Sequence, residues 1–356
     1  MFSFKFGKVI KGLVIVGVSL VILGTIGCAN NNKKTLRIYN AGEYIKESLI
    51  EKFEKENGCD VVYSTFDSNE AMYTMLNSGE KYDILVPSDY MIERLIKEKY
   101  LQKLDWSKIT VKEDLVEEVL NKDYDPGNKY SVPYYWGTVG ILYNTEEIDK
   151  KDLEDGWELL RNKKYKNKLY MYNSERDSFM IALKALGYSM NTSKKSELDK
   201  AYKWLVEQNK KMKPVYVGDD VIDNMISGNK DMAVVYSGDA ALIMSETKKK
   251  LDFFIPKQGT NEWVDGMVLT KDCKNTDLAY DFINFILSEE NALPNTEYIG
   301  YSSSVKNVYE DMQNTTFKGI SSYKVDTSNK KNEVFKYQDD ETRRYTSELW
   351  TKVISQ

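Results

Sequence analysis

Apolar and polar residues follow two alternating periods along most of this chain. Short apolar runs are separated by segments in which apolar residues recur every three or four positions. The first of these runs lie at 36–39, 60–64 and 82–86. In the segment 44–57, Ile45, Leu49 and Phe53 fall on one helical face, and Gly58 follows as a stop signal. Repeated strand–helix units of this length predict an α/β fold, with mainly parallel sheets flanked by helices.

The same alternation continues beyond a strong turn at residues 125–127. Two extended segments, 130–133 and 138–144, follow this turn, and strand–helix units then resume with a strand at 169–172. We therefore expect two lobes that are joined by extended hinge crossings and hold a ligand between them. The predicted bounds are 35–137 with about 264–307 for the first lobe, and 138–263 with about 308–356 for the second.

Residues 1–27 have the layout of a signal peptide. Lysines in the first eleven residues precede an uncharged, mostly apolar stretch that ends directly before Cys28. This layout resembles a bacterial lipoprotein signal, which implies that Cys28 becomes the lipidated N-terminus and that 28–34 is a tether. The alternative is a retained N-terminal membrane anchor. Both predict a folded part that is extracytoplasmic or periplasmic and is anchored to the membrane.

The composition excludes several classes of function. The chain has no histidine, so Ser-His-Asp catalysis, histidine-ligated zinc and histidine acid–base chemistry are unavailable. Its 50 basic and 55 acidic side chains give a net charge of −5, without the basic excess that a nucleic-acid surface needs. No C-x-x-C occurs among its cysteines, and whether Cys59 and Cys273 form a disulfide stays open. We expect a monomeric protein that is not an enzyme and has no cofactor, no metal and no nucleic-acid partner.

Acidic, hydroxyl and aromatic side chains follow four of the predicted strands. They are Glu43 and Tyr44 after 36–39, Ser88, Asp89 and Tyr90 after 82–86, Ser174, Glu175 and Asp177 after 169–172, and Tyr236 and Asp239 at the end of 232–236. In open α/β sheets, ligands bind beyond the carboxyl ends of strands. Carboxylates mixed with aromatic rings suit an elongated organic cation. The four loops therefore predict a site for a polyamine-like cation.

Each of these residues also has a structural alternative. Asp89, Asp177 and Asp239 fall at predicted helix starts, where a carboxylate caps backbone N–H groups. The tyrosines are equally suited to packing against neighbouring elements. Trp263 and Asp265 are more specific, because residues two apart in an extended segment point to one face and can grip a single ammonium. Their alternative is a buried tryptophan beside a solvated aspartate.

Several stretches of the chain resemble one family of proteins. They are YSTFDSNE at 63–70, VPSDY at 86–90, YSVPYYWG at 130–137, ALGYS at 185–189 and YIGY at 298–301. In this order they resemble the spermidine/putrescine-binding proteins of bacterial ABC importers, the PotD type. The resemblance runs from about residue 36 to near the C-terminus. It implies a two-lobed type II periplasmic-binding fold and a role in transport, with a polyamine ligand and ABC transporter permease subunits as partners.

The resemblance also implies which residues line the cleft. Carried over position by position, they are Tyr44, Ser88, Tyr90, Asp177, Tyr236, Trp263, Asp265 and Tyr301. Two positions depart from the family pattern, because Ala41 replaces a tryptophan and Ser174 replaces an acidic residue. Glu175 or Asp239 is then expected to supply the missing negative charge. The preference between putrescine and spermidine stays open.

Other functions also fit parts of the sequence. A binding protein for an amino acid, a sugar or a ferric ion is one alternative, and the 26 tyrosines suit iron. Two carboxylates suffice for glycoside hydrolysis without histidine. A surface adhesin would need no small ligand. The acid-and-ring pattern favours polyamine capture over these alternatives.

Overall fold

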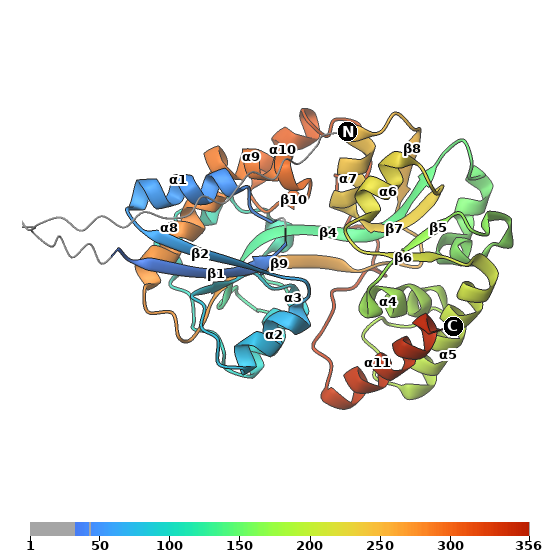
Figure 1. Cartoon of the computed structure of the whole chain (residues 1–356), viewed down its shortest axis with the longest axis horizontal. Helices are drawn as coiled ribbons and strands as arrows, with labels where there is room; N and C mark the ends of the chain where they lie inside the picture. The colour runs from blue at the N-terminus through green and yellow to red at the C-terminus, as the bar shows by residue number, and fades with distance from the viewer. Residues whose placement is uncertain (1–32, 43, 356) are drawn as a thin grey trace, which may run out of the picture. The chain divides into compact units, whose positions relative to one another are not determined.

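The computed structural model describes residues 33–42 and 44–355, and Lys34–Gln356 form one compact unit. Four predictions lie wholly or partly outside the described residues: the signal peptide 1–27, the lipidation site Cys28, the tether as far as residue 32, and the site residue Glu43. The described unit consists of two α/β lobes (Figure 1). The α/β class predicted from the sequence is therefore present in both halves.

The first lobe has a sheet between two layers of helices (Figure 1). Its strands are β1 (Thr35–Ala41), β2 (Asp60–Phe66), β3 (Ile84–Leu85), β9 (Glu262–Leu269), β10 (Ser302–Ser303) and the first part of β4 (Ser131–Asn144). One face is covered by α1 (Glu47–Asn57), α8 (Thr276–Leu287), α9 (Glu289–Ile299) and α10 (Lys306–Asn314), the other by α2 (Asn69–Asn77) and α3 (Asp89–Lys97). Short 3₁₀ helices η1 (Trp106–Lys108), η2 (Lys112–Asp114) and η3 (Glu117–Val119) lead into β4.

The second lobe repeats this layering around the remainder of β4 (Figure 1). Its other strands are β5 (Leu169–Tyr172), β6 (Val215–Val217), β7 (Met232–Tyr236) and β8 (Leu251–Phe254). One face carries α6 (Val221–Ser227) and α7 (Ser237–Glu246), and the other carries α4 (Glu175–Ala185), α5 (Lys195–Met212) and α11 (Asp340–Ile354). The 3₁₀ segments η4 (Lys150–Arg161) and η5 (Lys163–Tyr165) precede β5.

Strand β4 passes through both lobes. Its residues 131–138 pair antiparallel with β9, and its residues 139–144 pair antiparallel with β7 and β8. All of β4 is buried, as expected for a strand covered on both faces. The strand order is β2-β1-β3-β9-β4-β7-β5-β6, with β8 and β10 also paired to β4. The prediction of mainly parallel sheets is wrong in this respect: the sheets are mixed, because single extended strands, not strand–helix units, make the crossing.

The packing of the C-terminal part corrects the predicted lobe bounds. Helix α10 contacts α9 and β10, and Phe317 and Tyr323 pack in one apolar cluster with Val305. Residues as far as Tyr323 therefore belong to the first lobe, although the sequence predicted that the second lobe would resume near residue 308. It then returns along 326–339 to α11, which contacts α4 and α5.

Cys59 and Cys273 are both buried and do not form a disulfide. None of the helices in the described part of the chain has the length and apolar character needed to cross a membrane.

Candidate functional site

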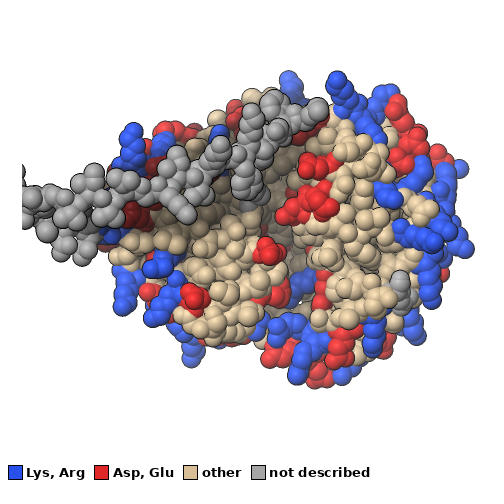
Figure 2. All heavy atoms as spheres, in the orientation of Figure 1, with Lys and Arg blue, Asp and Glu red and all other residues tan. Residues whose placement is uncertain are grey.

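A cleft of about 690 Å³ lies where the carboxyl ends of β1, β3, β5 and β7 meet β9. Acidic side chains gather along the hollow in the middle of the visible face, and lysine and arginine lie mainly around its edges (Figure 2). The residues of the predicted site that line the cleft are Tyr44, Ser88, Asp89, Tyr90, Ser174, Asp177, Tyr236, Asp239, Trp263, Asp265 and Tyr301. The structure thus brings the predicted loops together at one cavity.

Two tyrosine–aspartate pairs flank one part of the cleft. The Tyr44 hydroxyl donates a hydrogen bond of 2.6 Å to Oδ2 of Asp265, and the Tyr301 hydroxyl donates one of 2.7 Å to Oδ1 of Asp239. Both aspartates are 7% exposed. A tyrosine hydroxyl fixes each carboxylate without neutralising its charge, so the negative charge remains available to a ligand.

A third pair stands on the second lobe. The Tyr236 hydroxyl donates a hydrogen bond of 2.8 Å to Oδ2 of Asp177, whose backbone N–H is capped by the Ser174 hydroxyl at 3.3 Å. The other carboxylate oxygen of Asp177, Oδ1, is buried and has no hydrogen-bond partner. Such a buried acceptor is costly unless a ligand or water supplies a donor. Ser174 therefore acts as the helix cap that its sequence context allowed.

Aromatic rings form a continuous wall between these pairs. Tyr172, Tyr236, Trp263, Tyr301 and Tyr44 follow one another with ring centroids 5.1, 5.9, 5.2 and 5.6 Å apart. Each contact is edge-to-face, the arrangement that the ring quadrupoles favour. The wall offers π faces and apolar area to a chain of methylene groups that ends in cations.

Burial strongly affects the charges of the cleft. It raises the pKa of Asp265 to about 6 and that of Asp239 to about 7, although hydrogen bonds from tyrosine hydroxyls oppose the shift. Burial also raises the pKa of Asp177, against the hydrogen bond from the Tyr236 hydroxyl. Among residues 33–42 and 44–355, no lysine or arginine forms an ion pair with any of these three aspartates. A positively charged ligand would therefore stabilise their ionised forms.

Two predicted residues have mainly structural contacts. Asp89 is fully buried, and its carboxylate accepts hydrogen bonds from the backbone N–H of Tyr90 at 2.6 Å and of Val264 at 3.2 Å. It joins the start of α3 to β9, which is the capping role that the sequence allowed. Glu175 does not line the cleft. Burial raises the pKa of its carboxyl group, and a hydrogen bond with the Ser347 hydroxyl of α11 opposes this rise.

Tyr90 and Ser88 line the cleft, but each already has a protein partner. The guanidinium of Arg176 stacks on the Tyr90 ring, with Cζ 3.7 Å from the ring centroid. Ser88 exchanges two hydrogen bonds with Asn69, of 3.0 and 3.1 Å. Ser88 also forms an isolated β-bridge with Asp265, so it helps to hold that aspartate in place.

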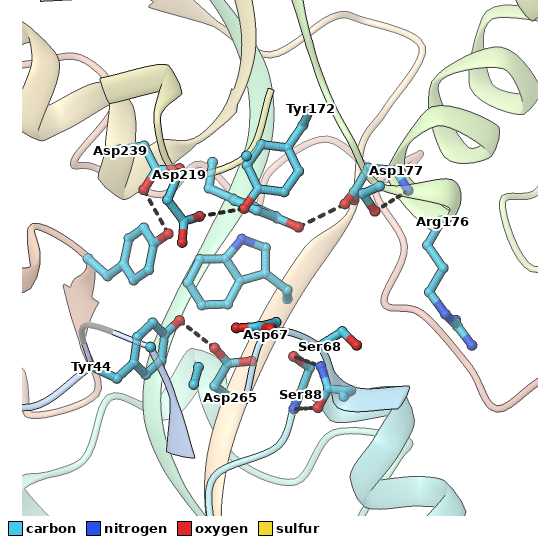
Figure 3. Close-up of a pocket in the computed structure, with 18 of the residues that line it drawn as sticks. Tyr44, Asp67, Ser68, Ser88, Tyr172, Arg176, Asp177, Asp219, Asp239 and Asp265 are labelled. Carbon is cyan, nitrogen blue, oxygen red and sulfur yellow. Dashed lines mark hydrogen bonds between the residues drawn. The ribbon is translucent and has the colours of Figure 1, made fainter. Parts of the chain in front are cut away.

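Several residues that line the cleft were not predicted as site residues: Asp67, Tyr172, Arg176 and Asp219. Asp67 and Arg176 lie inside or next to sequence stretches already associated with the predicted site, so their position could have identified them as cleft residues. Asp219 follows β6, a strand of three residues that is too short to show a period. Figure 3 shows Asp219, Asp239 and Tyr172 along one side of the pocket, and Asp177 and Arg176 at another.

Comparison with known proteins agrees with this geometry. The model of a family described as bacterial extracellular solute-binding protein matches residues 48–318. The chain belongs to this family. A spermidine/putrescine-binding periplasmic protein from Salmonella typhimurium is 37% identical over 284 residues, which is 78% of this chain and 80% of that protein. The family consists of solute-binding proteins, so the prediction of a non-enzymatic role in transport is confirmed.

Solved structures show the same two-lobed fold. The PotD substrate-binding protein of a spermidine/putrescine ABC transporter from Streptococcus pneumoniae superposes with a TM-score of 0.77 at 37% identity, over 91% of this chain and 99% of that one. The Tp0655 lipoprotein of Treponema pallidum gives a TM-score of 0.75 at 27% identity, over 90% and 99% of the two chains. The predicted periplasmic-binding fold is therefore confirmed.

Proposed function

We propose that this protein captures linear polyamines such as putrescine and spermidine outside the cytoplasm and delivers them to the permease of an ABC importer. One observation carries the proposal. Buried carboxylates from both lobes, each held by a tyrosine hydroxyl, are joined by a wall of aromatic rings and have no lysine or arginine partner among the described residues. The printed names of the relatives from Salmonella and Streptococcus support the same class of ligand.

In the proposed complex, one ammonium pairs with Asp265 and another pairs with Asp177, whose Oδ1 accepts a hydrogen bond from it. The methylene chain lies against Trp263, Tyr236 and Tyr301. Each cation–π contact contributes about 0.5–2 kcal/mol, depending on desolvation. Loss of one partner from a buried charge pair costs about 2–5 kcal/mol. The carboxylates therefore select for cations at the right spacing, and the apolar wall supplies much of the attraction.

The lobes are proposed to close on the ligand by a hinge motion. The chain crosses between them at the middle of β4, at the start of β9 and along 326–339. Three extended crossings allow rotation without breaking either apolar core. The closed form is the one that the permease would bind.

Membrane attachment through a lipid on Cys28 is part of the proposal. The apolar stretch that ends at this cysteine supports it. The Treponema relative is itself named a lipoprotein. A single lipid chain gives only marginal membrane binding, so the proposal implies the several acyl chains of a lipoprotein modification.

Calorimetric titration of the purified protein with putrescine, spermidine and lysine tests the proposed function. Saturable binding of at least one polyamine at one site per chain is expected, with much weaker binding of lysine, whose carboxylate meets an anionic cleft. Lysine acts as the matched control because it has two amino groups and a similar length. Binding of lysine, a sugar or ferric ion, with no heat from either polyamine, would refute the proposal.

A further inference from the structure

A fourth tyrosine–aspartate pair stands at the rim of the cleft. The Tyr172 hydroxyl donates a hydrogen bond of 2.8 Å to Oδ1 of Asp219. Tyr172 ends β5, whereas Asp219 lies in the loop between β6 and α6. Both residues line the same cleft as the three pairs described above. A ligand with two ammonium groups, held by Asp265 and Asp177, leaves this pair without a role.

Asp219 lies close enough to Asp239 to affect its charge. The negative charge of Asp219 adds to burial in raising the pKa of Asp239. The two carboxylates lie on the same side of the pocket (Figure 3). Within the described ranges, no lysine or arginine forms an ion pair with Asp219 or Asp239. Two like charges at one place favour a cation between them.

The opposite end of the cleft already contains a cation of the protein. Arg176 stacks on Tyr90 at 3.7 Å and lies 5.4 Å from the Phe335 ring, and its Nε is 3.9 Å from a carboxylate oxygen of Glu70. Glu70 also accepts a hydrogen bond from the Tyr90 hydroxyl. An additional ammonium near this end would meet a like charge. The charges of the cleft therefore favour extension of a longer ligand toward Asp239 and Asp219.

An independent observation indicates that the cleft holds a donor-bearing ligand. Asp177 is 4% exposed and lines the cleft, yet its Oδ1 has no hydrogen-bond partner. An ammonium bound at Asp177 would satisfy this acceptor and fix one end of the ligand. The remaining acidic positions, at Asp265 and at the Asp239–Asp219 side, then receive the other nitrogens.

We infer that Tyr172, Asp219 and Asp239 form a subsite for the third ammonium of a linear triamine, and that this subsite makes the protein prefer a triamine to a diamine. The inference rests on the proposed function, since it assigns a further part of the same cleft. Asp219 supplies the charge, Tyr172 holds it in position, and Asp239 supplies the second carboxylate.

Calorimetric titration with spermidine and putrescine tests this inference in three variants. Asp219→Asn removes the charge at an exposed position, so it should leave the fold intact. Tyr172→Phe removes only the hydroxyl that positions Asp219. Asp223→Asn is the matched control, because Asp223 is exposed on the same segment, carries the same charge and does not line the cleft.

The unsubstituted protein should bind spermidine more tightly than putrescine. Asp219→Asn should weaken spermidine binding about fivefold, the effect of roughly 1 kcal/mol for a partly exposed ion pair, and change putrescine binding less than twofold. Tyr172→Phe should act in the same direction with a smaller effect, and Asp223→Asn should change neither affinity by twofold. Three outcomes would overturn this inference while leaving the proposed function in place. They are equal losses for both amines in Asp219→Asn, an unchanged spermidine affinity in that variant, and an equal loss in the Asp223→Asn control. Failure of the unsubstituted protein to bind either amine would overturn the proposed function itself.

Discussion

The Tyr44 hydroxyl donates a hydrogen bond of 2.6 Å to Asp265, a residue 221 positions further along the chain. Tyr44 follows the end of β1, and Asp265 lies within β9, where it pairs with Tyr135 of β4, a few residues before β4 crosses between the lobes. One side chain of the proposed amine site is therefore fixed to the strands on which the hinge depends. In the proposed hinge motion, a ligand at Asp265 would therefore act on strands that lead to the crossing between the lobes.

Asp265→Asn should weaken polyamine binding at least about tenfold, because it removes a buried charge and keeps the volume of the side chain. Titration calorimetry measures the affinity, and thermal unfolding of the free protein checks the fold. Asp231→Asn is a suitable comparison, since Asp231 pairs with Lys168 far from the cleft lining. An affinity unchanged by Asp265→Asn would remove this residue from the site.

Trp263, in the aromatic wall, should contribute more to binding than Tyr90, which lies outside the wall. Trp263→Leu is expected to weaken binding about 2- to 30-fold, the range of one cation–π contact, and Trp263→Phe to restore part of the loss. Tyr90→Leu should have a smaller effect on the amine, because Arg176 already covers the ring. Fluorescence or calorimetric titration of the three variants separates these effects. A larger loss at Tyr90 than at Trp263 would show that the ligand displaces Arg176.

Binding should strengthen as the pH rises from about 5 to 8. The pKa of Asp265 is raised to about 6 and that of Asp239 to about 7, mainly by burial, so both are partly protonated at the lower end of this range. A bound ammonium favours their ionised forms, and protons are released. Titrations in buffers of different ionisation enthalpy measure this release. Proton uptake, or an affinity that falls over this range, would contradict the assigned charges.

The stability of the free protein should change in the opposite direction. Both carboxyl groups have higher pKa values in the folded chain than in the unfolded chain, so between about pH 4 and 7 the folded state binds more protons. Their contribution to stability is present at low pH and is lost as the pH rises through 6 and 7. Comparing the thermal unfolding of Asp239→Asn with that of the unsubstituted protein, at several pH values, measures the contribution of Asp239 to this pH dependence. The variant should lose part of the pH dependence, and an identical pH profile would exclude Asp239 as its source.

Gly238→Ala should damage the site. An added Cβ would lie 1.5 Å from Cδ1 of Tyr301, so the ring that holds Asp239 must shift. We expect a loss of affinity of about tenfold, similar to the loss of one buried contact. Ser245→Ala is the control, since Ser245 is an exposed residue of the same helix α7 and does not line the cleft. Equal affinities in the two variants would argue against a role for the Tyr301 ring.

Much of the cleft lining was predictable because strand ends bring loops together whatever their separation in sequence. The tyrosines and aspartates after β1, β5 and β7 were found in this way. Asp219 was missed because its strand, β6, has only three residues. The structural role of Asp89 was predicted only as an alternative. One of its two backbone partners, Val264, lies on a strand far away in sequence, and a local pattern does not reveal such a contact.

The fold was predictable to a similar extent. Helical periodicity and turn residues gave the α/β units, but periodicity carries no information on strand direction. The mixed sheet follows from antiparallel pairing of β4 with β9, a long-range contact that a local pattern does not encode. The late return of the chain to the second lobe depends on the packing of Phe317 and Tyr323 in the first apolar core.

A crystal structure of the protein with bound spermidine tests the central claim most directly. The account predicts one spermidine in the cleft, with separate ammonium nitrogens about 2.7–2.9 Å from carboxylate oxygens of Asp265 and Asp177. Its methylene groups should lie against Trp263. An empty cleft at saturating spermidine, or an amine bound on another surface, would contradict it.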